Sequence, residues 1–342
     1  MPFQPEEKYV WDLWFAHDGK EQHLFYLQAD REACDFDHHK RHNLSSVGHA
    51  LIKDGQICEA SKGSVFSAST TDDTWDNYSI WTGSIIKDPD SGKFLMFYTA
   101  RKREDIAIET PSEFQRPQNI GLAVSDDLVN WKRHPNSVSS PVIANPGTSD
   151  HFDGVAWRDP YVFKLGDYFY CLITARLEPN EKYNIGDWDQ GGTIAWLRSK
   201  DLYDWSAATP QILVTSRHFY ELEVPQLFSH EIEGKRVYYL IFCAQRKACS
   251  KERLEQLPDS ENQSGTYLFT SEPMELESLE LPRFESPAKL LTPGLYAGKI
   301  LNPESTSPTI YGFHIGTDEE SQCGGILSAT LDKGVLSAHI NT

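Results

Sequence analysis

The sequence predicts an all-β fold, a five-bladed β-propeller that occupies residues 1–342 as a single domain. Two observations carry this prediction. One supersecondary pattern returns five times along the chain, at intervals of about 60 to 75 residues. Short runs rich in β-branched and aromatic residues lie between the copies, whereas long amphipathic helical periodicity is scarce. Four strands per copy, arranged radially, would close into a propeller.

The repeated pattern is clearest in "LAVSDDLVNWKRHP" (122–135) and "AWLRSKDLYDWSAATP" (195–210). Each reads as a strand, then Ser, an acidic residue, Leu, two residues and Trp. Fainter copies begin at residues 48, 265 and 324. A pair of β-sandwiches with coincidental Trp spacing is the alternative fold. No Pro/Gly/Ser-rich linker divides the chain, and we expect no separate carboxy-terminal domain.

The strands are expected in apolar runs such as "KFLMFYTA" (93–100), "DYFYCLITA" (167–175) and "RVYYLIFCAQ" (236–245), each bounded by turn residues. Aromatic residues make up 12% of the chain, with 9 Trp and 15 Tyr. This composition suits strands and sugar-binding clefts better than helix bundles.

The charge and composition exclude several classes of protein. The formal net charge is −18 at pH 7, and no Lys/Arg-rich run occurs, which argues against binding to nucleic acid or to an anionic membrane surface. The sequence shows neither a membrane-spanning apolar stretch nor a secretion signal, so we expect a cytoplasmic protein. Its six cysteines form no CxxC pair, and free buried thiols are expected rather than a disulfide or a zinc site. The six are Cys34, Cys58, Cys171, Cys243, Cys249 and Cys323.

Five polar motifs occur once per repeat, at a similar place in each. They are "VWDLW" (10–14), "WTGS" (81–84), "WRDP" (157–160), "ELEVP" (221–225) and "LYAGK" (295–299). Equivalent places on the blades of a propeller converge around its axis. We therefore expect Asp12, Asp159 and Glu223 to share one pocket.

Converging carboxylates repel one another, so one can remain protonated while another is ionised. Cleavage of a glycosidic bond needs this combination, a proton donor for the leaving oxygen and an anion beside the anomeric carbon. Tryptophans near the acids also fit sugar recognition, because apolar sugar faces stack on indole.

Each motif alone has a purely structural interpretation. Asp12 could be a turn residue or a buried acid, and Asp159 could form a salt bridge in an Asp-Pro turn. Residues 81–84 could be a turn with a core Trp, and Glu221 could be a surface partner for Arg217. Each motif occurs once per repeat and at a similar place in it. Independent structural roles do not predict this regular spacing, so the spacing favours a shared function.

The histidine-rich segment "DHHKRHN" (37–43) suggests a metal site at first sight. His38 and His39 are adjacent, however, and would point to opposite faces of a strand. We therefore expect a solvated loop here and no bound metal.

At the five motifs the sequence resembles the β-fructosidase clan, glycoside hydrolase families 32 and 68, which includes invertases and levansucrases. "VWDLW" looks like the nucleophile motif of family 68, "WRDP" like the Arg-Asp-Pro motif of both families, and "ELEVP" like the acid/base motif. "HLFYLQA" (23–29) and "VGHA" (47–50) look like landmarks of family 32. The resemblance covers about residues 9 to 250. Val224 departs from it, since family 68 usually has Arg after the acid/base and family 32 has Cys. The chain also has no room for the trailing β-sandwich of family 32, which places it nearer family 68.

The resemblance implies a retaining enzyme that acts on sucrose or a fructo-oligosaccharide through a covalent fructosyl-enzyme, with no cofactor. Asp12 would be the nucleophile, Asp159 the transition-state stabiliser and Glu223 the general acid/base. Glu221 would contact substrate and tune the acid. The other substrate-binding residues implied are Trp11, Trp81, Thr82, Ser84, Arg158 and Arg246, with Thr82 or Ser84 assisting beside the nucleophile. Hydrolysis or transfer, and the oligomeric state, stay open.

Three other functions are compatible with a propeller of this kind. An inverting arabinofuranosidase or xylosidase of glycoside hydrolase family 43 would use a similar order of acids, although "WTGS" together with "WRDP" disfavours it. A non-catalytic sugar-binding propeller is the second alternative, and the intact set of three acids counts against it. A purely structural interaction propeller is the third, and it has no need of three acids at its axis.

Overall fold

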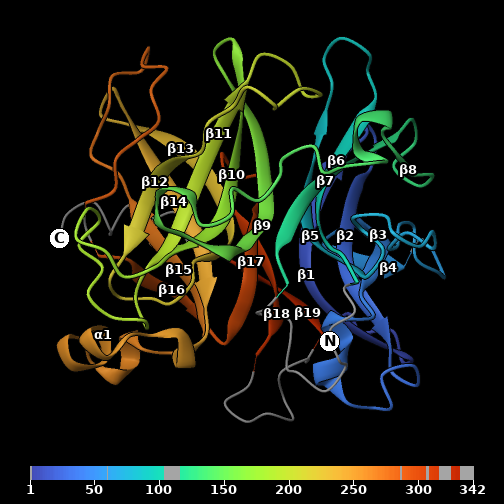
Figure 1. Ribbon diagram of the computed structural model, residues 1–342, viewed down its shortest axis with the longest axis horizontal. Coiled ribbons are helices and arrows are strands. Elements are labelled where there is room, and N and C mark those ends of the chain that lie inside the picture. The colour runs from blue at the N-terminus through green and yellow to red at the C-terminus, as the bar shows by residue number, and fades with distance from the viewer. Residues whose placement is uncertain are drawn as a thin grey trace.

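Five antiparallel sheets surround a common axis in the computed structural model, and the predicted five-bladed β-propeller is confirmed (Figure 1). The structure describes residues 2–59, 61–103, 116–285, 287–305, 308–315 and 325–331. Consecutive strands pair within each blade, so the chain completes one sheet before it starts the next. The β-sandwich alternative is therefore excluded.

The strands of the first three blades, in chain order, have the following bounds. Blade 1 holds β1 (Lys8–His17), β2 (Gln22–Asp30), β3 (Ser46–Lys53) and β4 (Gln56–Glu59). Blade 2 holds β5 (Ser79–Lys87), β6 (Phe94–Arg101), β7 (Gln118–Ser125) and β8 (Lys132–Arg133). Blade 3 holds β9 (Phe152–Leu165), β10 (Tyr168–Leu177), β11 (Gly192–Ser199) and β12 (Gln211–Ser216).

The last two blades and the helical segments complete the described chain. Blade 4 holds β13 (Glu223–Ile232), β14 (Lys235–Ala244), β15 (Gly265–Thr270) and β16 (Lys289–Pro293). Blade 5 holds β17 (Leu295–Leu301), β18 (Thr309–His314) and β19 (Ile326–Thr330). The helical segments are α1 (Lys251–Gln256) and the 3₁₀ turns η1 (His38–His42), η2 (Pro135–Ser137), η3 (Ser149–His151), η4 (Arg246–Ala248) and η5 (Asp259–Glu261).

The ring of blades closes on itself. The first strand of each blade is the inner one, and β1 contacts both β5 and β17. Phe3 pairs with Ile326 of β19, donating an N–H bond of 2.8 Å and accepting one of 2.9 Å. The amino-terminal segment thus lies against the edge of blade 5, which protects that edge from solvent.

The repeated Ser-x-Asp-Leu-x-x-Trp pattern forms the turn after the third strand of blades 2 and 3. In blade 2 the Asp127 carboxylate accepts N–H bonds from Val129 and Asn130, and the Trp131 indole donates to Leu128 O at 3.1 Å. Asp201 and Trp205 repeat this arrangement in blade 3. The pattern is thus a capped turn that buries its tryptophan.

These tryptophans join one blade to the next. Trp131 meets Phe25 of β2 edge to face at 5.9 Å between ring centroids, and Trp205 meets Phe97 of β6 at 5.8 Å. Phe25 and Phe97 occupy the second strand of the preceding blade in both cases. The tryptophan of the sequence repeat therefore packs each of these blades against the preceding one.

Every inner strand carries one extra residue at its polar motif. The register shifts lie at Asp12 in β1, Thr82 in β5, Asp159 in β9, Val224 in β13 and Ala297 in β17. Four of these residues have left-handed backbones, with φ of 32° at Asp12, 58° at Asp159, 54° at Val224 and 52° at Ala297. A β-bulge bends its strand and redirects side chains. The five bulges turn the motif residues toward the axis.

The cysteines that the structure describes are free, and four of the five are buried. Cys58 is exposed, contrary to the expectation of buried thiols, and Cys323 lies outside the described residues. Among the described helices, none combines the length and the apolar character that crossing a bilayer requires.

Candidate active site

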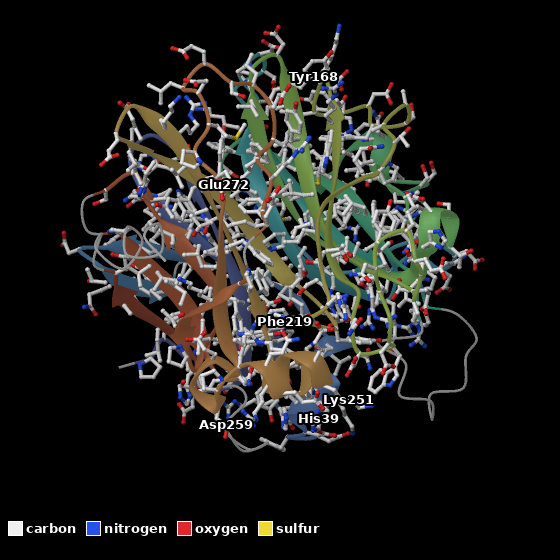
Figure 2. The ribbon with its side chains drawn as sticks, turned by 90° about the vertical axis from the view of Figure 1, so that its left-hand side faces the viewer. His39, Tyr168, Phe219, Lys251, Asp259 and Glu272 are labelled. Carbon is white, nitrogen blue, oxygen red and sulfur yellow. The ribbon has the colours of Figure 1, made fainter. Side chains whose placement is uncertain are left out.

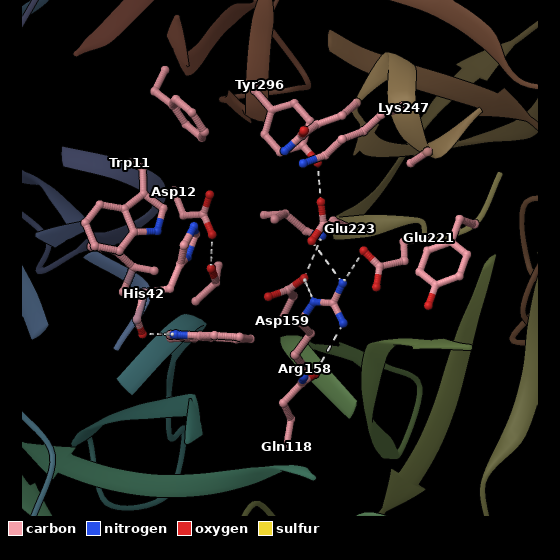
Figure 3. A pocket seen from close by; sticks show the side chains of 18 of the residues that line it. Trp11, Asp12, His42, Gln118, Arg158, Asp159, Glu221, Glu223, Lys247 and Tyr296 are labelled. Atoms are coloured by element: carbon pink, nitrogen blue, oxygen red, sulfur yellow. Dashed lines mark hydrogen bonds and ion pairs between the residues drawn. The ribbon is translucent and has the colours of Figure 1, made fainter. Parts of the chain in front are cut away.

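A cavity of about 360 Å³ lies where the five inner strands meet (Figure 3). Its lining includes the predicted residues Trp11, Asp12, Trp81, Thr82, Arg158, Asp159, Glu221 and Glu223, together with Val224 and Tyr296. His39, which also lines it, lies with Lys251 and Asp259 at one end of the molecule, and Tyr168 lies at the other end (Figure 2). The structure therefore brings the three predicted acids together in one site.

Arg158 links three carboxylates at the centre of the cavity. Its Nη2 lies 2.8 Å from Glu221 Oε2 and 2.9 Å from Glu223 Oε1, and its Nε lies 3.7 Å from Asp159 Oδ2. Gln118 Oε1 accepts a further bond from Nη1 at 3.2 Å. Arg158 is buried, so this one cation holds the acids at close range in a medium that screens charge poorly.

Asp12 stands opposite this group, on the wall formed by β1 (Figure 3). Burial raises the pKa of its carboxyl from 3.8 to about 7, and the charges of Asp159 and Glu223 add to the effect. The Thr82 hydroxyl donates to Asp12 Oδ2 and opposes the shift. Burial therefore favours the protonated form of Asp12 well above the pH at which a free aspartate ionises.

Asp159 is held by the backbones of its neighbours. Its Oδ2 accepts the Val224 N–H at 3.0 Å, and its own N–H donates to Thr99 Oγ1 at 2.9 Å. Burial raises the pKa of the Asp159 carboxyl, and Arg158 counteracts the rise. Val224 takes part through its backbone, since its left-handed conformation aims the N–H at Asp159. Such a conformation is rare for a β-branched residue and strains the chain.

Glu223 opens β13 and has a partner on each oxygen. Arg158 occupies Oε1, and the Tyr296 hydroxyl donates to Oε2. Tyr296 belongs to the "LYAGK" motif of blade 5, but its hydroxyl was not predicted as a site group. From the same motif, Lys299 donates to the carbonyl oxygens of Val224 and Pro225 at 3.2 and 2.6 Å and so holds the bulge that follows Glu223.

Glu221 precedes β13 rather than lying within it. Its carboxylate turns inward to Arg158, and burial raises its pKa while Arg158 opposes the rise. The interpretation of Glu221 as a surface partner of Arg217 is excluded, because Arg217 pairs with Glu252 at 2.7 Å.

Two indoles form an apolar wall beside Asp12, and each carries an arginine. Arg101 lies 3.9 Å from the Trp81 ring centroid, and Arg41 lies 5.4 Å from that of Trp11. The Trp81 indole donates to His42 O at 2.7 Å. A cation over an indole fixes the ring, which makes the wall a rigid apolar surface.

Two predicted residues lie outside the cavity lining. Ser84 Oγ accepts the Val162 N–H at 3.1 Å and thereby joins β5 to β9. Arg246 turns away to Asp259, at 3.0 Å, and to Asn262 O. The next residue, Lys247, lines the cavity in its place. Thr82, not Ser84, is therefore the hydroxyl beside Asp12.

The histidine-rich segment is not a solvated loop. Residues 38–42 form the 3₁₀ turn η1, and His39, Arg41 and His42 line the cavity. Ligand atoms of Asp37, His38 and His39 lie within 4.8 Å of one another. The expected absence of a metal stays a prediction.

Comparison with known proteins places this geometry in a class. Residues 65–324 match the sequence model of the glycosyl hydrolases family 32 N-terminal domain. No curated protein matches the sequence. The match begins after blade 1, so Asp12 lies outside the matched range.

Solved structures of the same clan share the fold. Bombyx mori GH32 β-fructofuranosidase has 17% identity and a TM-score of 0.56, over 95% of this chain and 62% of that chain. Bacillus subtilis levansucrase has 13% identity and a TM-score of 0.59, over 96% and 88%. A family 32 glycoside hydrolase from Bifidobacterium adolescentis has 14% identity and a TM-score of 0.61, over 97% and 57%. The chain thus spans less than two thirds of the length of both family 32 proteins.

The propeller and its axial acids are those of the β-fructosidase clan. The family match covers well over half of the residues, and the chain belongs to glycosyl hydrolase family 32.

Proposed function

We propose that the protein cleaves β-fructofuranosides such as sucrose with retention of configuration, through a fructosyl-enzyme on Asp12. The observation that carries this proposal is the placement of Asp12 and Glu223 on opposite walls of one cavity, with Asp159 between their strands (Figure 3). A mutant of the Bombyx mori enzyme has been solved with sucrose and the Bacillus subtilis levansucrase with oligosaccharides, which supports a saccharide as the substrate.

In the first step the Asp12 carboxylate attacks the anomeric carbon of the fructosyl unit. The bond to the leaving oxygen breaks, and Glu223 gives its proton to that oxygen. Asp159 and Arg158 hold the sugar hydroxyls while positive charge develops on the ring. Trp11 and Trp81 supply the apolar surface on which the ring stacks.

In the second step Glu223 removes a proton from water or from a sugar hydroxyl. The oxygen so activated attacks the anomeric carbon, and the bond to Asp12 breaks. Water yields hydrolysis, and a sugar yields transfer. Because Asp12 attacks only when ionised, kcat/KM should fall below about pH 7, where its carboxyl takes up a proton.

The direct test is incubation of purified protein with sucrose, followed by quantification of glucose, fructose and oligosaccharides. Asp12→Ala and Glu223→Ala should each reduce glucose release by at least about 10³-fold, since both groups take part in bond breaking. Asp126→Ala, an exposed acid, and Ser328→Ala on β19 are matched controls and should keep full activity. Full activity in either site variant would refute the assignment.

The products also settle the remaining alternatives. Equal glucose and fructose indicate a hydrolase, and a deficit of fructose indicates a transferase. NMR of the first-formed anomer tests the family 43 alternative, because inversion is incompatible with a fructosyl-enzyme. Saturable binding without turnover on any fructoside would instead indicate a sugar-binding propeller.

A further inference from the structure

His42 occupies the wall of the cavity that also carries the nucleophile. Its ring lies 5.7 Å from the Trp11 ring and 6.0 Å from the Trp81 ring, edge to face with both. Figure 3 shows His42 on the same side of the cavity as Trp11 and Asp12. The imidazole therefore stands between the two indoles on which a sugar ring would stack.

The backbone of His42 is fixed from two directions. Its carbonyl oxygen accepts the Trp81 indole N–H at 2.7 Å and Arg101 Nη2 at 2.8 Å. These bonds tie η1 to blade 2, and they set the position from which the ring enters the cavity. Arg101 also stacks on Trp81, so ring, indole and arginine form one rigid group.

The ring itself has hydrogen-bonding capacity to spare. Neither ring nitrogen of His42 bonds to any residue that the structure describes. The surroundings also keep the ring neutral, because burial and the charges of Arg41 and Arg101 hold its pKa well below 6.5. A neutral imidazole offers one N–H donor and one acceptor nitrogen. A sugar hydroxyl can donate to the acceptor nitrogen or accept from the N–H, so either ring nitrogen can bind one.

We propose that His42 is a substrate-binding residue of the fructosyl site, whose neutral ring hydrogen-bonds a hydroxyl group of the sugar that stacks beside Trp11 and Trp81. The inference rests on the proposed function for the identity of that sugar. It assigns a role to a segment that lies between β2 and β3, away from the inner-strand motifs. Arg101, which bonds the His42 carbonyl oxygen, acts on His42 as a positioning residue.

The test compares His42→Ala with the unchanged protein on sucrose and on a series of deoxyfructosides, each lacking one hydroxyl of the fructosyl unit. His42→Ala should lower kcat/KM on sucrose roughly 10-fold, the loss of one neutral hydrogen bond. On the analogue that lacks the contacted hydroxyl, the two proteins should have equal kcat/KM. His42→Gln keeps a neutral donor and acceptor and should recover part of the loss.

The control variant is His314→Ala, an exposed histidine at the end of β18. It should match the unchanged protein on every substrate. An undiminished kcat/KM in His42→Ala would overturn the proposal. An equal loss on all the deoxyfructosides would also overturn it, because that outcome indicates a structural role.

Calorimetry separates this inference from the proposed function. Binding of fructose and sucrose is measured in Asp12→Ala, with and without His42→Ala, where turnover is not needed. Weaker binding in the double variant supports the role of His42 even if the protein cleaves no fructoside. Equal binding overturns it even if the protein is an active fructosidase, and absence of binding in both overturns the two proposals together.

Discussion

The burial that raises the pKa of Asp12 also makes the folded protein less stable when this carboxyl is ionised. Its carboxyl is buried beside two other acids, and its pKa is about 7 in the folded protein against 3.8 for the free side chain. The fold thus favours the protonated form. The stabilisation that the protonated Asp12 carboxyl gives the folded protein is fully present below pH 3.8. It is lost as the pH rises through 7. At pH 8 the ionised carboxylate costs on the order of 4 kcal/mol, since each pKa unit corresponds to about 1.4 kcal/mol.

Asp12→Asn should therefore stabilise the protein above neutral pH while it abolishes activity. The amide has the shape of the acid but never ionises, so the gain in unfolding free energy should be small at pH 4 and grow by a few kcal/mol toward pH 8. Urea unfolding at both pH values measures the difference. Asp126→Asn, on an exposed acid, is the control and should show no such growth. A gain that is independent of pH would contradict the burial of a charge at Asp12.

Individual residues also show what the sequence could and could not predict. Asp12, Asp159 and Glu223 could be placed together because each belongs to a polar motif that occurs once per blade. His42 could not, because it lies in the turn η1 between two strands, where no periodicity applies. Arg246 points away from the cavity and the next residue lines it instead, because side chains on a 3₁₀ turn diverge by about 120° per residue. Ser84 lies two residues beyond its bulge and faces β9.

At the scale of the element, a pair of histidines joins β2 to β3. His23 Nδ1 lies 2.8 Å from His49 Nε2, so one ring must donate and the other accept. Both rings are buried, and burial lowers both pKa values, that of His49 to about 4. These are the histidines of "HLFYLQA" and "VGHA", the two motifs that resemble family 32 landmarks. Their position away from the cavity indicates a structural role.

The pair should make the protein sensitive to acid. Because the folded pKa of His49 lies below 6.5, the unfolded chain takes up the proton first, and stability is lost as the pH falls from 6.5 toward 4. His49→Gln removes the titrating ring, so its deficit in unfolding free energy should be largest at pH 7.5 and shrink at pH 4.5. His314→Gln, on an exposed ring, is the control. A deficit that stays constant with pH would show that the ring does not titrate on unfolding. Between pH 4 and 6.5 the titration of Asp12 changes the free energy of unfolding in the opposite direction to that of His49. The pH dependence of His49→Gln must therefore be compared with that of the unchanged protein, because the curve of the unchanged protein alone contains both effects.

At the scale of the whole molecule, the Phe3–Ile326 pairing closes the ring of blades. Phe3 also packs on Tyr26 at 5.4 Å between ring centroids, so it connects blade 5 to blade 1. The fold class could be predicted because one β-rich pattern recurs five times, and radial repetition of four-stranded units makes a propeller. The Phe3–Ile326 pairing, called the clasp below, could not be predicted. It consists of two backbone hydrogen bonds, which need no particular side chains and so produce no sequence pattern.

Phe3→Pro should weaken the clasp by removing the N–H that bonds Ile326 O as well as the ring. Phe3→Leu, which keeps the N–H and an apolar side chain, is the matched control. We expect Phe3→Pro to lower the midpoint of thermal unfolding by several degrees more than Phe3→Leu, with one cooperative transition in both. Equal midpoints would show that the backbone pairing adds nothing to closure.

The extra residue in each inner strand has a consequence for redesign. The five bulge positions carry different side chains. Two are carboxylates, and two others, Val224 and Ala297, belong to the buried apolar core. Thr82 and Ala297 hold two of these positions without a charge. Thr82 lines the cavity, so substitution at residue 82 can alter the number of acids around a bound sugar, whereas a charge at the fully buried Ala297 would enter the core. New specificities in this scaffold should be reachable one side chain at a time.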